Sequence, residues 1–190
     1  MSDVLIVSSF QKSCEFLTGF IKENFGSGIK TANSGSDARR ILNEKDFSVV
    51  IINAPLTDEF GNDLAINATE ISSSGVVLIV KNEIVDEVAE NVEDYGVLTA
   101  AKPINKVLLH QTVKLAFSTH SRVIGFKKEN VQLQSKIEEM RLVDRAKCVL
   151  IQYLTMTEPQ AHRYIEKQAM DMRVSKRIVA EGILKTYETY

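Results

Sequence analysis

The chain has 190 residues, enough for one large domain or for a domain of ordinary size with a small appendage. Hydrophobic residues make up 44% and charged residues 25%, so the composition excludes a disordered or a fibrous chain. No uncharged stretch approaches the roughly 20 apolar residues of a membrane span, and the start has no secretory signal pattern. We therefore expect a cytoplasmic protein without a membrane partner. Cys14 and Cys148 fit neither a metal motif nor a disulfide framework, and we expect both to be reduced and mostly buried.

The net charge of −2 is distributed unevenly along the chain. Residues 1–119 hold ten Lys and Arg against sixteen Asp and Glu, and residues 120–190 hold thirteen against nine. The first part therefore carries −6 and the second part +4. This asymmetry favours a polyanion as the partner of the second part, although solvated helices often carry a similar excess.

Five short apolar segments rich in β-branched residues occur in the first half of the chain. They are Val4–Val7, Gly28–Thr31, Val49–Ile52, Val76–Val80 and Gly96–Thr99. Segments with apolar residues at helical spacing separate them. Continuous apolar runs are typical of a parallel sheet that is covered on both faces. The pattern predicts an α/β doubly wound five-stranded parallel sheet over residues 1–119, with its functional groups at the carboxyl ends of the strands.

A long helical segment follows the predicted sheet. We expect Ile104–Thr119 to be the last helix of the sheet domain and residues 120–141 to continue it as a coiled coil that forms a homodimer. Six residues alternate at spacings of three and four, as the a and d positions of a coiled coil do: Val123, Phe126, Asn130, Leu133, Ile137 and Met140. Asn130 occupies an a position, where asparagine favours a two-stranded register. The alternative is an amphipathic helix that packs on its own domain.

The last third predicts a small three-helix bundle over residues 137–190. Its first helix continues from the coiled coil through Tyr153. The second begins at Thr157-Glu158-Pro159-Gln160, which combines a capping box with proline in the first turn. The third begins at Ser175.

The strand ends of the first domain resemble those of response-regulator receiver domains. Lys102-Pro103 follows the last strand, and Leu56 and Gly61 keep the family's spacing from the phosphoacceptor position. In that family an acidic pair holds magnesium and an aspartate accepts the phosphoryl group. Here the pocket is degenerate. The positions that correspond to the family's site hold Ser8, Ser9, Asn53, Val80 and Lys102, and of these only the lysine is the family's residue. The aromatic switch position holds Thr99.

These replacements remove the chemistry of phosphorylation. An amide is not a nucleophile toward phosphorus, whereas a carboxylate is. Magnesium requires carboxylate oxygens, and two serines supply no charge. We therefore expect no cofactor and no essential metal, and we expect Lys102 to hydrogen-bond Asn53 or a carbonyl group.

The C-terminal segment is similar to the ANTAR domain, the antiterminator module of several bacterial regulators. The resemblance is carried by Arg145-Ala146-Lys147, Leu150, Thr157-Glu158, Ala161, Ala169-Met170, Arg173, Ser175, Ala180 and Ile183-Leu184. The family glycine after the alanine-lysine pair is Cys148 here. The resemblance implies a dimer that binds paired stem-loops in leader transcripts and prevents a terminator from forming.

The residues expected to bind RNA are cations of the predicted bundle: Arg141, Arg145, Lys147, Arg163, Lys167, Arg173, Lys176 and Arg177. Tyr153 and Tyr164 could stack on unpaired bases or belong to the core. We interpret the alanines of this segment as packing residues that let the helices approach closely.

Two other functions remain open from the sequence. The second and third helices of the bundle could form a helix-turn-helix that reads duplex DNA. Alternatively, the chain could be a protein-interaction module that binds no nucleic acid. An enzyme is not expected, because the sequence has no phosphate-binding glycine loop and no nucleophile elbow. His110, His120 and His162 have no partner at metal-ligand spacing, and the acidic loop of Asp58, Glu59 and Asp63 is expected to be solvated.

Overall fold

A computed structural model describes residues 3–187 of the chain. It divides the chain into two compact units, Met1–Phe126 and Lys127–Tyr190. The boundary between the units lies within one continuous helix, α5 (Lys106–Leu154). Each unit has buried core residues of its own. The three-part division with boundaries near residues 119 and 141 stays a prediction.

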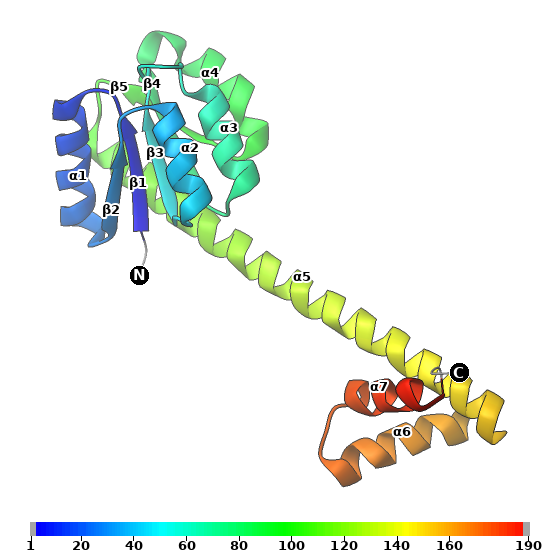
Figure 1. The fold of residues 1–190 in the computed structure, drawn as a ribbon. Coiled ribbons are helices and arrows are strands. Elements are labelled where there is room, and N and C mark those ends of the chain that lie inside the picture. The colour runs from blue at the N-terminus through cyan, green and yellow to red at the C-terminus, as the bar shows by residue number, and fades with distance from the viewer. Residues whose placement is uncertain (1–2, 188–190) are drawn as a thin grey trace. The chain divides into compact units, whose positions relative to one another are not determined.

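The first unit is the predicted five-stranded parallel sheet with helices on both faces (Figure 1). The strands lie in the order β2-β1-β3-β4-β5, and all neighbouring pairs are parallel. Their bounds are β1 Asp3–Ser8, β2 Gly28–Ala32, β3 Val49–Asn53, β4 Gly75–Lys81 and β5 Leu98–Lys102. The helices of this unit are α1 Gln11–Phe25, α2 Gly35–Glu44, α3 Asn62–Ile71 and α4 Val85–Val92, with the first part of α5 and the short 3-10 helices η1 Asn82–Ile84 and η2 Glu93–Tyr95.

Two separate cores cover the two faces of the sheet, which explains the continuous apolar runs. Alternate residues of the central strands point to opposite faces, so Ile6 packs with α1 and α5, whereas Leu5 packs with α2, α3 and α4. Gly75 at the start of β4 permits close packing of α5, since a Cβ atom there would lie 2.1 Å from the carbonyl oxygen of Ala116. The helix therefore lies directly against the sheet.

The fifth strand begins two residues later than predicted and also ends later. Gly96 has φ +75° and ends η2, and Val97 is buried in the core before the strand begins. The strand itself, Leu98–Lys102, contains two alanines and is only half-buried at the edge of the sheet. Small residues at an edge produce no β-branched run, so the sequence pattern misplaces this strand.

The start of the last helix of this unit also differs from the prediction. Asn105 precedes α5, and its Oδ1 accepts from the backbone N–H groups of Val107 (2.9 Å) and Leu108 (3.3 Å). An asparagine that satisfies these free amides marks the helix start. The helix therefore begins at Lys106 and not at Ile104.

The second unit contains the predicted three helices. They are the second part of α5, α6 (Glu158–Met172) and α7 (Lys176–Tyr187). The backbone N–H of Thr157 donates to Oε1 of Gln160 at 2.8 Å, which is the Gln160 half of the expected capping box. The turn between α6 and α7 passes through Arg173, whose φ of +54° is in the left-handed region.

Small residues fill the core of this bundle. Ala146, Ala161 and Ala180 are fully buried, and Leu150 and Ile165 lie between them at 1% exposure. This confirms that the alanines pack the helices together. The expectation for the cysteines was wrong in part: both are free, but Cys148 is exposed, since it lies on the side of α5 that faces away from Ala146 and Val149.

Candidate functional site

The degenerate acceptor position is closed by hydrogen bonds. Asn53 ends β3 and pairs in register with Ser8 at the end of β1. The Nδ2 atom of Asn53 donates to Oγ of Ser8 at 2.9 Å, and both side chains are buried. The Oδ1 atom of Asn53 is buried without a hydrogen-bond partner among the described residues. Asn53 therefore acts as a cross-strand link.

Lys102 is held by a backbone group and not by Asn53. Its Nζ donates to the carbonyl oxygen of Ala54, one of the two possibilities expected from the sequence. Burial, and to a lesser extent the charge of Lys81, lowers the pKa of Lys102 from its ordinary value.

The five predicted pocket residues do not line one common hollow. Val80 is fully buried in the core, and Ser8 and Asn53 are closed off by their mutual bond. Ser9 instead lines a separate hollow of about 620 Å³ beyond β1 and β2, with hydroxyl and amide groups around it. Its Oγ donates to the carbonyl oxygen of Asn33 at 3.4 Å.

These residues do not fit a magnesium ion. Ser8 and Ser9 are uncharged, and their hydroxyl groups already bond within the protein. In the part of the chain that the structure describes, no group of three or more His, Cys, Asp or Glu side chains could hold a metal ion. A hard divalent cation requires several carboxylate or carbonyl oxygens, which this edge of the sheet does not supply.

The acidic loop after β3 anchors α2, which the sequence did not indicate. The carboxylate of Asp58 accepts from the backbone N–H groups of Gly35 (2.8 Å) and Ser36 (2.9 Å) and from Oγ of Ser36 (2.8 Å). Glu59 forms a bidentate ion pair with Arg39 of the same helix. The negative charges lie at the helix N-terminus, where the free amides favour them. The loop is therefore bound to α2. Asp58 is exposed, as expected of a solvated loop, whereas Glu59 is partly buried.

The anchoring bonds lower the pKa of Asp58 to about 2, and the amide of Ser36 is the largest cause. A lowered folded-state pKa stabilises the fold above the unfolded value of 3.8, and this contribution is lost as the pH falls from there through about 2. We expect Asp58→Asn to speed hydrogen exchange at the Gly35 and Ser36 amides several-fold at neutral pH. Asp46→Asn, at an exposed aspartate, is the control. Equal exchange rates in both variants would contradict the conclusion that Asp58 anchors the start of α2.

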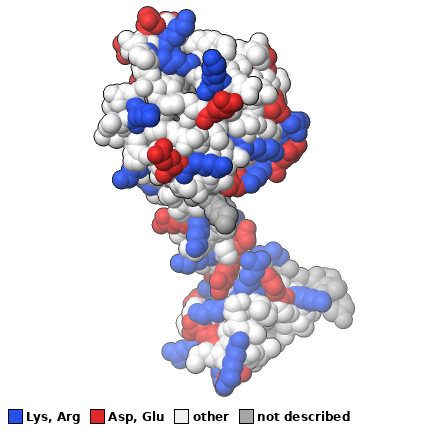
Figure 2. All heavy atoms as spheres, turned by 90° about the vertical axis from the view of Figure 1, so that its left-hand side faces the viewer, with Lys and Arg blue, Asp and Glu red and all other residues white. Residues whose placement is uncertain are grey.

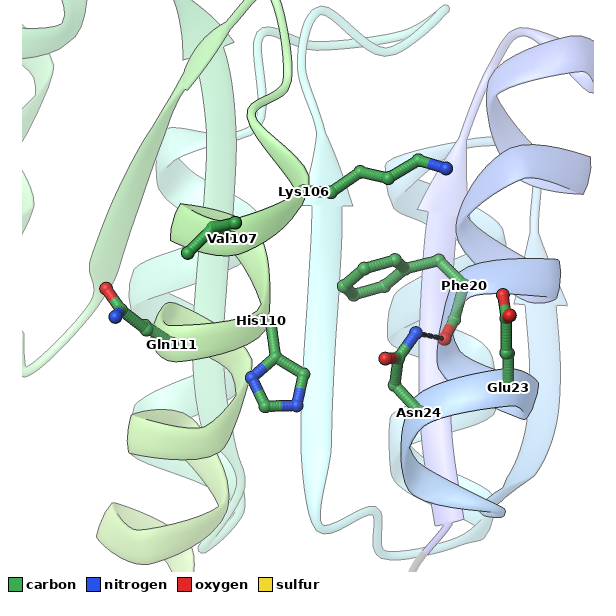
Figure 3. A pocket seen from close by; sticks show the side chains of 7 residues that line it. All are labelled: Phe20, Glu23, Asn24, Lys106, Val107, His110 and Gln111. Carbon is green, nitrogen blue, oxygen red and sulfur yellow. Dashed lines mark hydrogen bonds between the residues drawn. The ribbon is translucent and has the colours of Figure 1, made fainter.

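A further hollow lies between α1 and α5 (Figure 3). It measures about 410 Å³ and is lined by Phe20, Glu23, Asn24, Lys106, Val107, His110 and Gln111. The amide of Asn24 donates to the carbonyl oxygen of Phe20 at 2.8 Å, and the ring of His110 stacks on Phe25 with 5.1 Å between centroids. It contains none of the site residues predicted from the sequence.

The cations of the second unit differ in whether they already have acidic partners. Three do: Lys147 contacts Asp144 (2.8 Å) and Glu158 (2.9 Å), Lys176 contacts Glu166 (2.5 Å), and Arg177 contacts Glu181 (2.9 Å). The two carboxylates raise the pKa of Lys147. Arg141, Arg163, Lys167 and Arg173 are exposed and have no ion pair within residues 3–187, whereas Arg145 is exposed but does interact within the chain. In the view of Figure 2, positive and negative side chains are interspersed on this unit.

The two candidate aromatic residues differ in their surroundings. The ring of Tyr153 packs against Tyr187, with 5.4 Å between ring centroids. Tyr164 is 38% exposed on α6, next to Arg163. Tyr153 is 55% exposed, so exposure leaves both rings available for stacking on an unpaired base.

The fold of the first unit is that of a response-regulator receiver. It matches a two-component response regulator from Clostridium difficile with a TM-score of 0.53 and 20% identity, over 62% of this chain and 97% of that one. It also matches a receiver-domain protein from Clostridium thermocellum with a TM-score of 0.58 and 16% identity, over 65% and 99%. At these identities the likeness shows the fold alone.

The second unit matches a known domain family. Residues 131–184 match the ANTAR domain. The transcriptional regulatory protein PdtaR of Mycobacterium tuberculosis is 29% identical over 178 residues, which cover 91% of this chain and 84% of the relative. Residues 131–184 are therefore similar to an ANTAR domain, and most of the chain is similar to a transcriptional regulator. In the described residues, no helix is long and apolar enough to cross a membrane.

Proposed function

We propose that this regulator binds stem-loops of leader transcripts as a dimer, and that it does so without phosphorylation of its receiver. The observation that carries the proposal is the match of residues 131–184 to the ANTAR domain, which coincides with the three-helix unit. Hairpin loops present unstacked bases and a dense phosphate backbone. Exposed cations can contact the phosphates, and a neighbouring aromatic ring can stack on a base.

The four cations without ion pairs are the proposed RNA contacts. Arg163 and Lys167 are four residues apart on α6, so they share one helix face, and Tyr164 adjoins them. The paired cations Lys147, Lys176 and Arg177 contribute less, because a phosphate would have to compete with a carboxylate already in contact. The Lys147–Glu158 and Lys176–Glu166 pairs join neighbouring helices of the bundle, whereas Arg177–Glu181 lies within α7.

The dimer is proposed to form through the seam, defined as Val123, Phe126, Asn130, Leu133, Ile137 and Met140. Its large apolar members are 49–66% exposed in the single chain. Burying apolar area of this kind is favourable by about 25 cal/mol per Å², and a second copy in register would cover all six positions.

Independence from phosphorylation follows from the closed acceptor position. Asn53 offers no nucleophilic oxygen, its amide is bonded to Ser8, and Lys102 is bonded to Ala54. Incubation with acetyl phosphate and magnesium is expected to leave the mass of the intact protein unchanged. Asn53→Asp should also stay unmodified, because Ser8 and Ser9 supply no metal ligand. A stable phosphoryl adduct on either protein would contradict this part of the proposal.

The RNA contacts are tested by the salt dependence of binding. Replacing Arg163, Lys167 and Arg173 with alanine is expected to weaken binding to a synthetic RNA with two tandem hairpins and to flatten the plot of log K against log salt. The slope should fall by roughly 0.7–0.9 for each phosphate that is no longer neutralised. Replacing the exposed receiver lysines Lys12, Lys22 and Lys114 with alanine changes the net charge equally and is the control. An unchanged slope in the first variant would favour a protein-interaction module.

A further inference from the structure

The positions that flank the seam are mostly cationic. In the heptad set by the seam, the g positions are Arg122, Glu129 and Lys136, and the e positions are Lys127, Gln134 and Arg141. All six side chains are exposed, and the four cations have no ion pair in the part of the chain that the structure describes. Coiled coils usually place opposite charges at these positions to select their partner.

A parallel arrangement of two copies is the better one for this seam. In parallel register, Asn130 faces Asn130 of the second copy, and the two amides can bond to each other. In an antiparallel register centred on the seam, Asn130 would face Leu133 and leave a buried amide without a partner. The seam therefore favours a parallel dimer.

The parallel dimer brings like charges together on both of its sides. A residue at g lies next to the residue at e of the following heptad in the other helix, five positions later. Arg122 therefore meets Lys127 of the second copy, and Lys136 meets Arg141. Each side of the stalk thus has two clusters, each a pair of cations, and Glu129 with Gln134 of the other copy lies between them. The clusters are 14 residues apart, or about 21 Å along a helix that rises 1.5 Å per residue.

We infer that these flanking clusters bind the phosphate backbone of RNA, so that RNA holds the two helices of the stalk together. The inference rests on the proposed function and extends its RNA-binding surface beyond the bundle to the stalk. Phosphates that contact a cation from each copy replace repulsion across the seam with attraction to a shared anion. RNA binding and dimerisation therefore strengthen each other, as linkage requires.

The flanking clusters give the dimer two opposite salt responses. Without RNA, added salt screens the repulsion between the clusters, so the dimer should become tighter as ionic strength rises. With RNA, added salt weakens the complex, because counterions compete for the phosphates. The two trends have opposite signs in the same protein.

The decisive variant is Lys127→Glu/Lys136→Glu, which replaces none of the residues proposed for the bundle site, although the new carboxylate at position 136 adjoins Arg141, which belongs to both sites. In the parallel dimer it places a carboxylate at position 127 next to Arg122 and a carboxylate at position 136 next to Arg141, so both like-charged contacts become pairs of opposite charge. By sedimentation equilibrium without RNA, we expect dimerisation to become about 10- to 100-fold tighter. By fluorescence anisotropy with the tandem-hairpin RNA, we expect binding to become at least about tenfold weaker at roughly 0.15 M salt. A tighter dimer with weaker RNA binding is the signature.

The matched control compares Lys127→Glu with Lys128→Glu. The two residues are adjacent, both are exposed, and the change of charge is the same, but Lys128 is at the outward f position. Only Lys127→Glu should tighten the dimer. Equal effects of both variants on the dimer would overturn the parallel geometry.

The outcomes separate this inference from the proposed function. If the wild-type protein binds the RNA and Lys127→Glu/Lys136→Glu binds it equally well, the stalk site is overturned and the function of the bundle stands. If the double variant does not dimerise more tightly, the flanking clusters do not meet and the inference is overturned. If the wild-type protein binds no hairpin RNA, the proposed function falls, and the inference falls with it.

Discussion

Replacing Leu150 with alanine is expected to destabilise the second unit by about 2–5 kcal/mol. Leu150 is 1% exposed in the bundle core, among Ala146, Ala161 and Ile165. The core of this unit is small, and the alanine side chains around Leu150 are too short to fill the cavity that truncation leaves. A loss of this size approaches the whole stability of a domain of this length.

Hydrogen exchange measured peptide by peptide is the appropriate readout, because it reports on the two units separately. In α6 and α7 we expect protection to fall by roughly 30-fold to 3,000-fold, up to the limit set by unfolding of the whole unit. Protection in β1 and β3 of the receiver unit should not change.

The control for this substitution is Leu154→Ala, one turn further along α5. Leu154 is 44% exposed, so its truncation should change stability by less than about 0.5 kcal/mol. If both substitutions reduced protection in α6 and α7 equally, the core of the second unit could not be centred on Leu150.

Placing charges in the seam is expected to abolish the dimer. Leu133→Asp/Ile137→Asp puts four carboxylates into the interface of two copies, where they would be desolvated next to one another. A loss of more than about 5 kcal/mol corresponds to dimerisation weakened by more than roughly 3,000-fold. Analytical ultracentrifugation over a range of protein concentrations should then find a monomer for the variant and a dimer for the wild-type protein.

The matched control for the seam is Ile124→Asp/Val131→Asp. These residues are 47% and 65% exposed on the same helix, but at b positions outside the seam. The double substitution introduces the same charge and should leave the dimer intact. A monomeric wild-type protein, or equal loss of the dimer in both variants, would contradict dimerisation through the seam.

The sequence was most informative where one strong physical requirement acts on adjacent residues. Val49–Ile52 had to be a buried strand, because only a sheet covered on both faces tolerates four consecutive apolar β-branched residues in a short segment. The start of α6 was likewise evident, since Thr157, Pro159 and Gln160 satisfy the needs of a helix N-terminus locally. By contrast, the edge strand β5 is half-buried and carries no such requirement.

Contacts between distant residues could not be read from the sequence. Asp58 is 22 residues from Ser36, and nothing near either residue indicates that one binds the other. The same holds for Lys147, which appeared as a free cation although Glu158 neutralises it from the next helix. An ion pair between residues four positions apart on one helix can be predicted from the sequence, as for Arg177 and Glu181.

The proposed preference of a dimer of this chain for RNA over DNA is tested most directly by competition binding at roughly 0.15 M salt. The full chain is bound to a labelled RNA with two tandem hairpins and challenged with unlabelled RNA of the same sequence or with duplex DNA of equal length. We predict that the RNA displaces the label at a concentration at least about tenfold lower than the duplex does, with one dimer bound per RNA. Displacement by duplex DNA at an equal or lower concentration would contradict RNA recognition and favour a helix-turn-helix that reads DNA.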